Sequence, residues 1–294
     1  MWIVYLAIIA LLIVLSAVVI YHDTHNFKVY EYEVTTDKLG RDFVFVFLTD
    51  LHGYFYGKGN ERLIEAVDKI SPDAVLCAGD MITASKRHRN VELDSGLRLL
   101  EDLASRYPVY VSNGNHEEKI KTFKDSYRNL FDRYKSRLIR AGVKYLENDS
   151  VMMDGTDIRV TGLCLPLGYF TKVVKVKMPD GYLDSLIGRV NSAEKENFQL
   201  LIAHNPVYFK HYAKWGADLS LAGHVHGGII RLPLLGGVIS PAIALFPKYD
   251  AGKYEEDGST MILSRGLGTH TIHVRMFNPG EISVIRLKGK KNVT

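Results

Sequence analysis

Five short polar motifs occur along the chain, and most of them directly follow an apolar run. In order they are Asp50-Leu51-His52, Gly79-Asp80, Gly114-Asn115-His116-Glu117, His204-Asn205 and Gly223-His224-Val225-His226-Gly227-Gly228. They supply carboxylates, a side-chain amide and several imidazoles, which are the oxygen and nitrogen donors that bind Mn, Fe or Zn ions. Pairs of such ions hydrolyse phosphate esters without a covalent intermediate. The motifs therefore predict a two-metal site for phosphate chemistry.

The spacing within the motifs suggests how the side chains share ions. Asp50 and His52 are two residues apart, so on an extended chain they would point the same way and reach one ion. Asp80 follows a glycine, which permits a sharp turn, and its two oxygens can bridge two ions. His116, beside the predicted site, is placed to donate a proton to a leaving oxygen.

The motifs differ in how specific each one is when it is taken alone. Asp-x-His and Gly-Asp are common in proteins, whereas two histidines bracketed by glycines at 223–228 have no role in core packing. Two divalent ions would outweigh Asp50, Asp80 and one bridging hydroxide by about one positive charge, which favours an anionic phosphate and its transition state. We therefore interpret all five motifs, in this order, as one site.

The first 21 residues predict a membrane anchor. Met1–Tyr21 contains no charged side chain and, as a helix, would span roughly 30 Å, the thickness of the hydrocarbon core of a bilayer. The alternative is a cleaved signal peptide, which needs a basic start and a small-x-small cleavage site. No Lys or Arg precedes the run and Val18–Tyr21 is a poor cleavage site, so we favour a retained single-pass anchor and a membrane localisation. The scattered charges after it, Lys28, Lys38 and Arg41 among acidic residues, tilt only slightly towards a cytoplasmic catalytic part and leave the side open.

The segments between the motifs alternate between strand and helix patterns. We expect strands at Lys28–Thr35, Phe43–Leu48, Ala74–Ala78 and Val109–Val111, and helices at Asn60–Ile70, Val91–Ser105 and Tyr127–Ala141. This alternation favours an α/β fold with a mainly parallel sheet, in which ligands bind beyond the carboxyl ends of the strands. Asp50, Asp80 and Asn115 lie at such ends.

From Lys144 onward the sequence is richer in strands, which we interpret as a second sheet packed on the first, with helices outside. The expected strands are Tyr145-Leu146, Val151-Met152, Ile158–Gly162, Leu200–Ala203, Leu219–Leu221, Met261–Ser264 and Ile282–Leu287. Pro166–Asn197 and Pro233–Asp257 are less periodic and are expected to be loops or a cap beside the site.

The ordered motifs from Phe43 to Leu287 resemble the calcineurin-like metallophosphoesterase family. The resemblance implies a four-layer α/β/β/α sandwich preceded here by one transmembrane helix. It also implies that a metal-bridging hydroxide attacks phosphorus while His116 acts as general acid. One ion would be held by Asp50, His52, Asp80 and His226, and the other by Asp80, Asn115, His204 and His224.

The anchor and the segments Gly227–Pro233 and Leu263–Thr269 are similar to a membrane-anchored bacterial branch that includes UDP-2,3-diacylglucosamine pyrophosphatase-like proteins. That branch implies a phosphate ester or pyrophosphate substrate that is lipid-linked or a nucleotide sugar. Two positions depart from the pattern: Thr83 stands where a second Asp is common, and Ile229 stands where Gln is common.

We divide the chain into an anchor at 1–21, a juxtamembrane segment with the first strand at 22–41, a metallophosphoesterase domain at 42–288 and a basic tail at 289–294. Two alternatives remain: a non-catalytic scaffold that binds a phosphorylated head group or a partner, and a nuclease of the same fold. The net charge of +4 is too mild to indicate nucleic-acid binding, and no nucleic-acid partner is expected.

Overall fold

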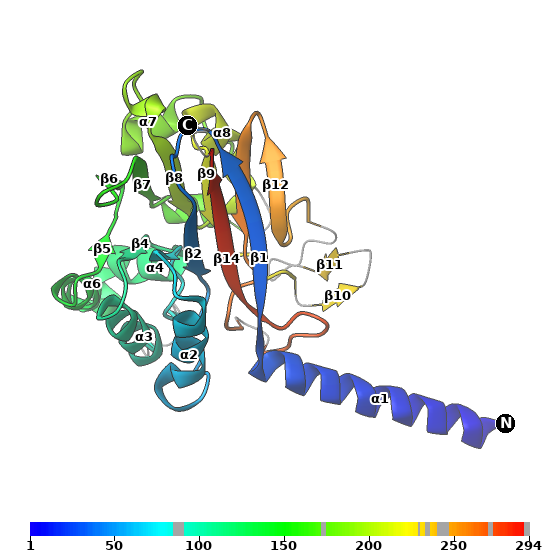
Figure 1. Ribbon diagram of the computed structural model, residues 1–294. Coiled ribbons are helices and arrows are strands. Elements are labelled where there is room, and N and C mark those ends of the chain that lie inside the picture. Colours follow the sequence, from blue (N-terminus) through cyan, green and yellow to red (C-terminus); the bar gives the residue numbers. More distant parts are fainter. Residues whose placement is uncertain are drawn as a thin grey trace.

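Two six-stranded sheets pack face to face in this protein, and helices cover the outer face of each (Figure 1). The computed structural model describes residues 1–84, 91–171, 175–228, 230–232, 236–239, 247–269 and 273–290. Three hydrophobic clusters fill the spaces between the four layers. The four-layer α/β/β/α sandwich that the family resemblance implies is confirmed.

The first sheet has the order β1-β14-β2-β3-β4-β5, and its neighbouring strands are parallel except β14 and β2. Its strands are β1 (Phe27–Thr36), β2 (Phe43–Leu48), β3 (Ala74–Cys77), β4 (Val109–Val111), β5 (Lys144–Tyr145) and β14 (Gly280–Gly289). The helices packed on it are α2 (Glu61–Ile70), α3 (Asp94–Ala104), α4 (Asn115–Thr122), α5 (Lys124–Tyr127) and α6 (Leu130–Arg140).

The second sheet has the order β12-β13-β9-β8-β7-β6, with parallel strands in the middle and an antiparallel strand at each edge. Its strands are β6 (Asp149–Met152), β7 (Ile158–Leu163), β8 (Phe198–Ala203), β9 (Leu219–Ala222), β12 (Gly252–Glu256) and β13 (Ser259–Leu263). The helices α7 (Tyr182–Ile187) and α8 (Phe209–Trp215) cover its outer face, and β10 (Ile230–Leu232) pairs with β11 (Gly236–Ile239) in a separate hairpin.

Strand β2 shows why its sequence is apolar throughout. Successive side chains of a strand point to opposite faces. Val46 and Leu48 therefore pack among the helices of the first outer layer, whereas Phe45 and Phe47 pack against the second sheet. A strand buried on both faces has no position for a polar residue, and the first polar residues appear where it ends.

Two strands that we expected in the second sheet belong to the first. Of Tyr145-Leu146, Tyr145 belongs to β5, which pairs with β4. Ile282–Leu287 lies within β14, which is inserted between β1 and β2. Apolar strand patterns identify a buried strand but not its partner, so these assignments were wrong. The expected loop at 233–257 contains β11 and β12 in its described parts.

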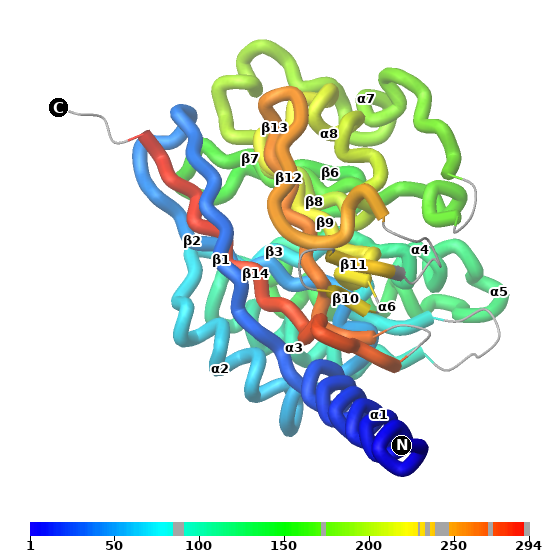
Figure 2. The backbone as a smooth tube through the Cα atoms, turned by 90° about the vertical axis from the view of Figure 1, so that its right-hand side faces the viewer, coloured from blue at the N-terminus to red at the C-terminus, as the bar shows by residue number. Residues whose placement is uncertain are grey.

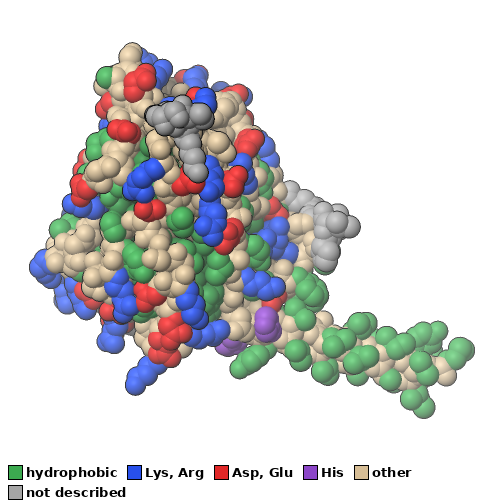
Figure 3. All heavy atoms as spheres, viewed as in Figure 1, with side chains coloured by type: hydrophobic (Ala, Val, Ile, Leu, Met, Phe, Trp, Pro, Cys, Tyr) green, Lys and Arg blue, Asp and Glu red, His purple; other side chains and the backbone are tan. Residues whose placement is uncertain are grey.

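The N-terminal helix α1 (Trp2–His25) projects from the body and ends four residues beyond the apolar run that we expected as the anchor. Hydrophobic side chains cover it along its length (Figure 3). Within the described residues it is the one helix long and apolar enough to cross a membrane.

The sheet topology places the end of α1 at a particular edge of the first sheet. Strand β14 runs antiparallel to β2, and β1 runs parallel to β14 with Phe27 opposite Gly280. The start of β1, and with it the end of α1, therefore lies at the edge where β2, β3 and β4 end (Figure 2). This is the edge that carries the polar motifs.

Candidate metal centre

The loops that follow the parallel strands of both sheets converge on one site. Asp50 and His52 follow β2, Asp80 follows β3, and the start of α4 follows β4. The second sheet contributes His204 after β8 and the 224–226 loop after β9. The side chains of these residues are buried, apart from the half-buried His224.

The predicted residues form three overlapping groups whose ligand atoms lie within 4.8 Å of one another. The groups are Asp50 with His52 and His226, His52 with Asp80 and His116, and Asp80 with His204 and His224. Asp80 is common to two groups and links them. Asn115 begins α4 beside them, and its buried Oδ1 has no hydrogen-bond partner among the described residues.

The distances between the donor atoms fit metal coordination. Two ligand atoms that share an ion at about 2.1 Å lie about 3.0–3.4 Å apart at octahedral or tetrahedral angles. His52 Nε2 lies 3.1 Å from His226 Nε2, which lies 3.5 Å from Asp50 Oδ1. His204 Nε2 lies 3.2 Å from Asp80 Oδ2. Asp50 Oδ1 and His204 Nε2 are buried and make no hydrogen bond of good geometry within the described chain, so both atoms can bind an ion.

The backbone at these residues differs from our expectation. We expected Asp50 and His52 to point the same way on an extended chain, but both have a positive φ, of 55° and 51°. His226 and Asp80 are left-handed too. Backbone N–H groups of Asp50 and His52 donate to the carbonyl oxygens of Gly79 and Asp80, so hydrogen bonds between the loops hold this conformation. Uncommon backbone conformations of this kind concentrate at functional sites.

Hydrogen bonds to Nδ1 separate the roles of two histidines. His204 Nδ1–H donates to the carbonyl oxygen of Ala78 at 2.8 Å, so in the neutral ring Nε2 carries a lone pair and faces Asp80. Metal-binding histidines are commonly oriented in this way. His116 Nδ1 instead accepts the backbone N–H of Ala84 at 2.7 Å, so in the neutral ring Nε2 carries the proton. This Nε2–H, 4.0 Å from Asp80 Oδ2, suits a proton donor better than a ligand.

In each carboxylate of the site, one oxygen is held by hydrogen bonds and the other points toward the imidazoles. Asp50 Oδ2 accepts hydrogen bonds from the Thr49 hydroxyl and the His224 backbone N–H, at 3.0 and 2.9 Å. Asp80 Oδ1 accepts the His116 backbone N–H at 2.7 Å. The remaining oxygen of each residue faces the imidazoles, so the donor atoms are oriented before any ion arrives.

The charges of the site are strongly coupled. Burial raises the pKa of Asp80, whereas nearby His204 and His116 lower it. The net result is a pKa well below the usual range of an aspartate. Burial lowers the pKa of His204, yet the carboxylates of Asp80 and Asp50 raise it to about 9. Burial and the charge of His204 lower the pKa of His224 to about 4. The carboxylates of Asp50 and Asp80 and the imidazole of His204 therefore stabilise one another's charged forms.

Two supporting residues were not predicted from the sequence. Glu117 is buried and accepts the backbone N–H groups of Asp80, Met81 and Gly114 at 2.7, 3.0 and 3.1 Å, so it fixes the Asp80 loop. Its position three residues after Gly114, as in a capping box, is the signal that indicates this role. Thr83, at the departure from the family pattern, donates its hydroxyl to the His52 carbonyl oxygen at 2.9 Å. Ile229 lies outside the described residues.

Replacing Glu117 with Gln should destabilise the fold. Burial and the Asp80 carboxylate raise the pKa of Glu117 to about 7, while the Asp80 backbone N–H lowers it. The amide NH₂ of Gln would face backbone N–H groups and leave a buried donor unpaired, which costs about 1–3 kcal/mol. Denaturant unfolding of the full chain in detergent measures this loss. Glu118→Gln is the control because Glu118 accepts from the Asn113 side chain, which a Gln oxygen still does; an equal loss in both variants would contradict the assignment.

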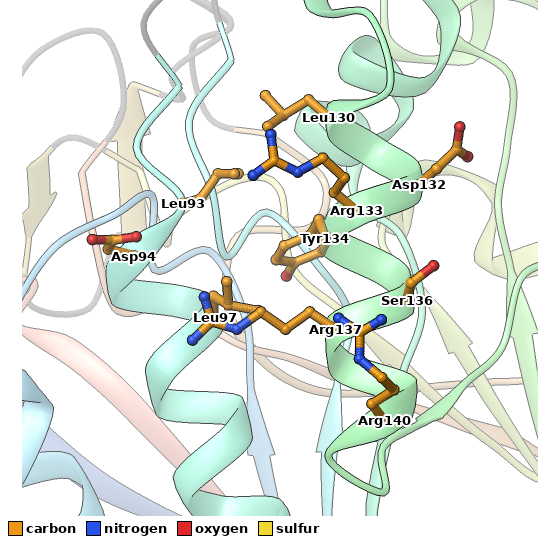
Figure 4. A pocket seen from close by; sticks show the side chains of 10 residues that line it. All are labelled: Leu93, Asp94, Leu97, Leu130, Asp132, Arg133, Tyr134, Ser136, Arg137 and Arg140. Atoms are coloured by element: carbon orange, nitrogen blue, oxygen red, sulfur yellow. The ribbon is translucent and has the colours of Figure 1, made fainter.

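A separate pocket of about 460 Å³ lies between α3 and α6 (Figure 4). Leu93 and Leu97 line one side, and Leu130, Tyr134 and Arg137 line the other. None of the residues predicted to bind metal or to act in catalysis lines it. Arg137 forms an ion pair with Glu101 of α3, so its positive charge has a structural partner.

The chain is similar to several known proteins. An uncharacterized metallophosphoesterase of Campylobacter jejuni, Cj0846, is 27% identical over 95% of this chain and 69% of its own length. The phosphodiesterase YaeI of Escherichia coli is 26% identical over 77% of this chain and 76% of its own. Among solved structures, an NAD nucleotidase of Haemophilus influenzae is 14% identical with a TM-score of 0.44, covering 76% of this chain and 45% of that one.

The calcineurin-like phosphoesterase family model matches residues 43–228, from the start of β2 to the end of the glycine–histidine motif. That range includes every residue predicted to bind metal. The clustered carboxylates and imidazoles and this match lead to one conclusion: the chain belongs to the calcineurin-like phosphoesterase family.

Proposed function

We propose that the protein is a membrane-tethered phosphohydrolase that works with two divalent metal ions. The observation that carries this proposal is Asp80, whose Oδ2 lies 3.8 Å from His52 Nε2 on one side and 3.2 Å from His204 Nε2 on the other. A carboxylate shared by two sets of ligands is the arrangement that a pair of ions requires.

The residues divide between two ions as the family resemblance implies. Asp50, His52, Asp80 and His226 would hold one ion, and Asp80, Asn115, His204 and His224 the other. When bound, such ions supply Lewis acidity and an activated water molecule. Oxygen and nitrogen donors accept Mn, Fe or Zn, and manganese is our working choice.

His116 is proposed as the general acid. Its Nε2–H is held at the site by the Ala84 N–H on the other ring nitrogen, so the proton faces the position of a leaving oxygen. The Lys119 ammonium lies 3.4 Å from the same Nε2 and adds positive charge where a phosphate would gather negative charge.

Metal affinity should depend on pH through His204. Its raised pKa of about 9 means that an ion displaces a proton from His204 at lower pH. The affinity for Mn²⁺ should therefore fall as pH drops below 9, by up to about tenfold per unit for each displaced proton. Titration of the metal-free full chain with Mn²⁺ at several pH values measures this slope. A flat profile, equal to that of a His204→Gln variant, would contradict the ligand role of His204.

The substrate is proposed to be a phosphorylated small molecule or lipid. The E. coli relative is named a phosphodiesterase, which supports a phosphate diester. We keep α1 as the proposed anchor and 42–288 as the proposed catalytic domain. The end of α1 lies at the same edge of the first sheet as the site, so an anchored protein would hold the site near the membrane. A signal sequence would have the same apolar character as α1.

Two other functions follow from the same fold. A non-catalytic scaffold would have no use for oriented ligands together with a proton donor, and a nuclease would need a more basic surface. Neither is supported by a further observation in the described structure.

Hydrolysis assays on the full chain in detergent test the proposal. With Mn²⁺ present, p-nitrophenyl phosphate or bis(p-nitrophenyl) phosphate should be hydrolysed. Metal binding with no hydrolysis of either compound would favour the scaffold. A screen of lipid pyrophosphates, nucleotide sugars and cyclic nucleotides would then identify the substrate class.

A further inference from the structure

The end of α1 is fastened to the loop that leads into β14. Asp23, near the end of this mostly exposed helix, is buried, and its Oδ2 accepts the backbone N–H of Asn278 at 2.9 Å. The Thr24 hydroxyl oxygen accepts the backbone N–H of Arg275 at 3.2 Å. Figures 1 and 2 show this loop beside the junction of α1 and the body.

The Asn278 side chain contacts the glycine–histidine loop, residues 223–228. Asn278 is fully buried, and its Nδ2 donates to the carbonyl oxygens of His226 and Gly228, at 2.8 and 2.7 Å. These two bonds fix the orientation of the amide and hold the loop on both sides of Gly227. Any side chain at Gly227 would press on Asn278 Oδ1, so the loop and the amide fit closely.

Arg275 extends the same support to Asp50. Its buried guanidinium donates to the carbonyl oxygens of Arg265, Gly266 and Gly268. The backbone N–H of Gly268 in turn donates to the Asp50 carbonyl oxygen at 2.6 Å. One loop therefore joins the end of the anchor helix to the backbones of two proposed ligands of the same ion.

We propose that Asn278 is a positioning residue for His226, and that Asp23 holds Asn278 in place, so that seating of the anchor helix supports one of the two metal ions. This inference rests on the proposed function. It predicts an unequal effect, because the Asn278 side chain donates to the carbonyl oxygens of His226 and Gly228, whereas its hydrogen bonds within the described residues include none to His204 or His224. General destabilisation of the fold would weaken both ions together.

Mn²⁺ titration of the full chain in detergent, followed by electron paramagnetic resonance, tests the proposal. Loss of a residue that orients a metal ligand typically costs 10–100-fold in affinity. Asn278→Ala should weaken one ion by about that factor, leave the other nearly unchanged, and replace the signal of a coupled Mn²⁺ pair by that of a single ion.

Variants of Asp23 test the connection to the helix. Asp23→Ala removes the acceptor of the Asn278 N–H and should weaken the same ion by up to about tenfold. Asp23→Asn keeps an oxygen acceptor and should restore affinity. Asn26→Ala is the matched control: Asn26 sits just past the same helix end and accepts from Arg62 of α2, away from the metal-ligand loop.

The outcomes separate the two proposals. The wild-type protein should bind two ions. If Asn278→Ala and Asp23→Ala bind each ion with wild-type affinity, the positioning role is wrong while the proposed function stands. If Asn278→Ala does not fold, the comparison of Asp23→Ala with Asp23→Asn decides the question. If wild-type protein binds no metal, the proposed function fails and the positioning role fails with it.

Discussion

Replacing Asp80 with Ala should lower kcat by about 10³-fold or more, because the interaction of metal ions with a reacting phosphate is worth several kcal/mol. Asp80 Oδ2 lies 3.2 Å from His204 Nε2 and 3.8 Å from His52 Nε2, within reach of proposed ligands of both ions. Its loss removes a ligand from both. Hydrolysis of bis(p-nitrophenyl) phosphate by the full chain, with metal content measured on the same sample, shows the effect.

The control for this variant is Asp102→Ala, which removes an exposed carboxylate from α3. The control should keep wild-type activity and metal content. If Asp80→Ala bound two ions and retained more than about a tenth of wild-type activity, the bridging role of Asp80 would be wrong.

Replacing His116 with Asn should lower kcat by about 10²–10⁴-fold while metal binding persists. The Asn oxygen can accept the Ala84 N–H in place of Nδ1, so the local hydrogen bond survives. The side chain can no longer supply a proton at the position of Nε2. The variant therefore separates proton donation from metal binding, which His116→Ala would not do as clearly.

The leaving group provides an internal check on His116. Nitrophenolate is a stable anion and leaves with little help from a proton donor, whereas an alkoxide must be protonated in order to leave. The loss in His116→Asn should be much larger for an alkyl phosphate ester than for its nitrophenyl counterpart. Equal losses for both esters, or a loss of bound metal that matches the loss of activity, would contradict the role of general acid.

The sequence predicted the layers of the fold, and which polar motifs come together, better than it predicted the strand partners and the backbone geometry. Apolar runs such as Phe43–Leu48 identify strands buried on both faces, because only such strands avoid polar residues altogether. The partner of a strand depends on distant segments, which is why β14 was placed in the wrong sheet. Likewise, Asp50 and His52 share a direction through left-handed backbone conformations that loop contacts impose, rather than through strand alternation.

The residues that support the site were harder to predict than the ligands. Glu117 and Asn278 act on backbone N–H and C=O groups of distant loops, and such partners leave no pattern in the side chains of the sequence. The proton position on His116 is fixed by Ala84 in the same way. The division of the chain at 21, 41 and 288, and the assignment of each ligand to one ion, stay predictions.

Metal content and activity of the same full-length sample test the central claim most directly. The purified chain in detergent should bind about two Mn²⁺ ions, lose phosphatase activity with a chelator, and regain it when Mn²⁺ is returned. Full activity in metal-free protein, or fewer than about one ion per chain in a sample that is folded and active, would contradict it.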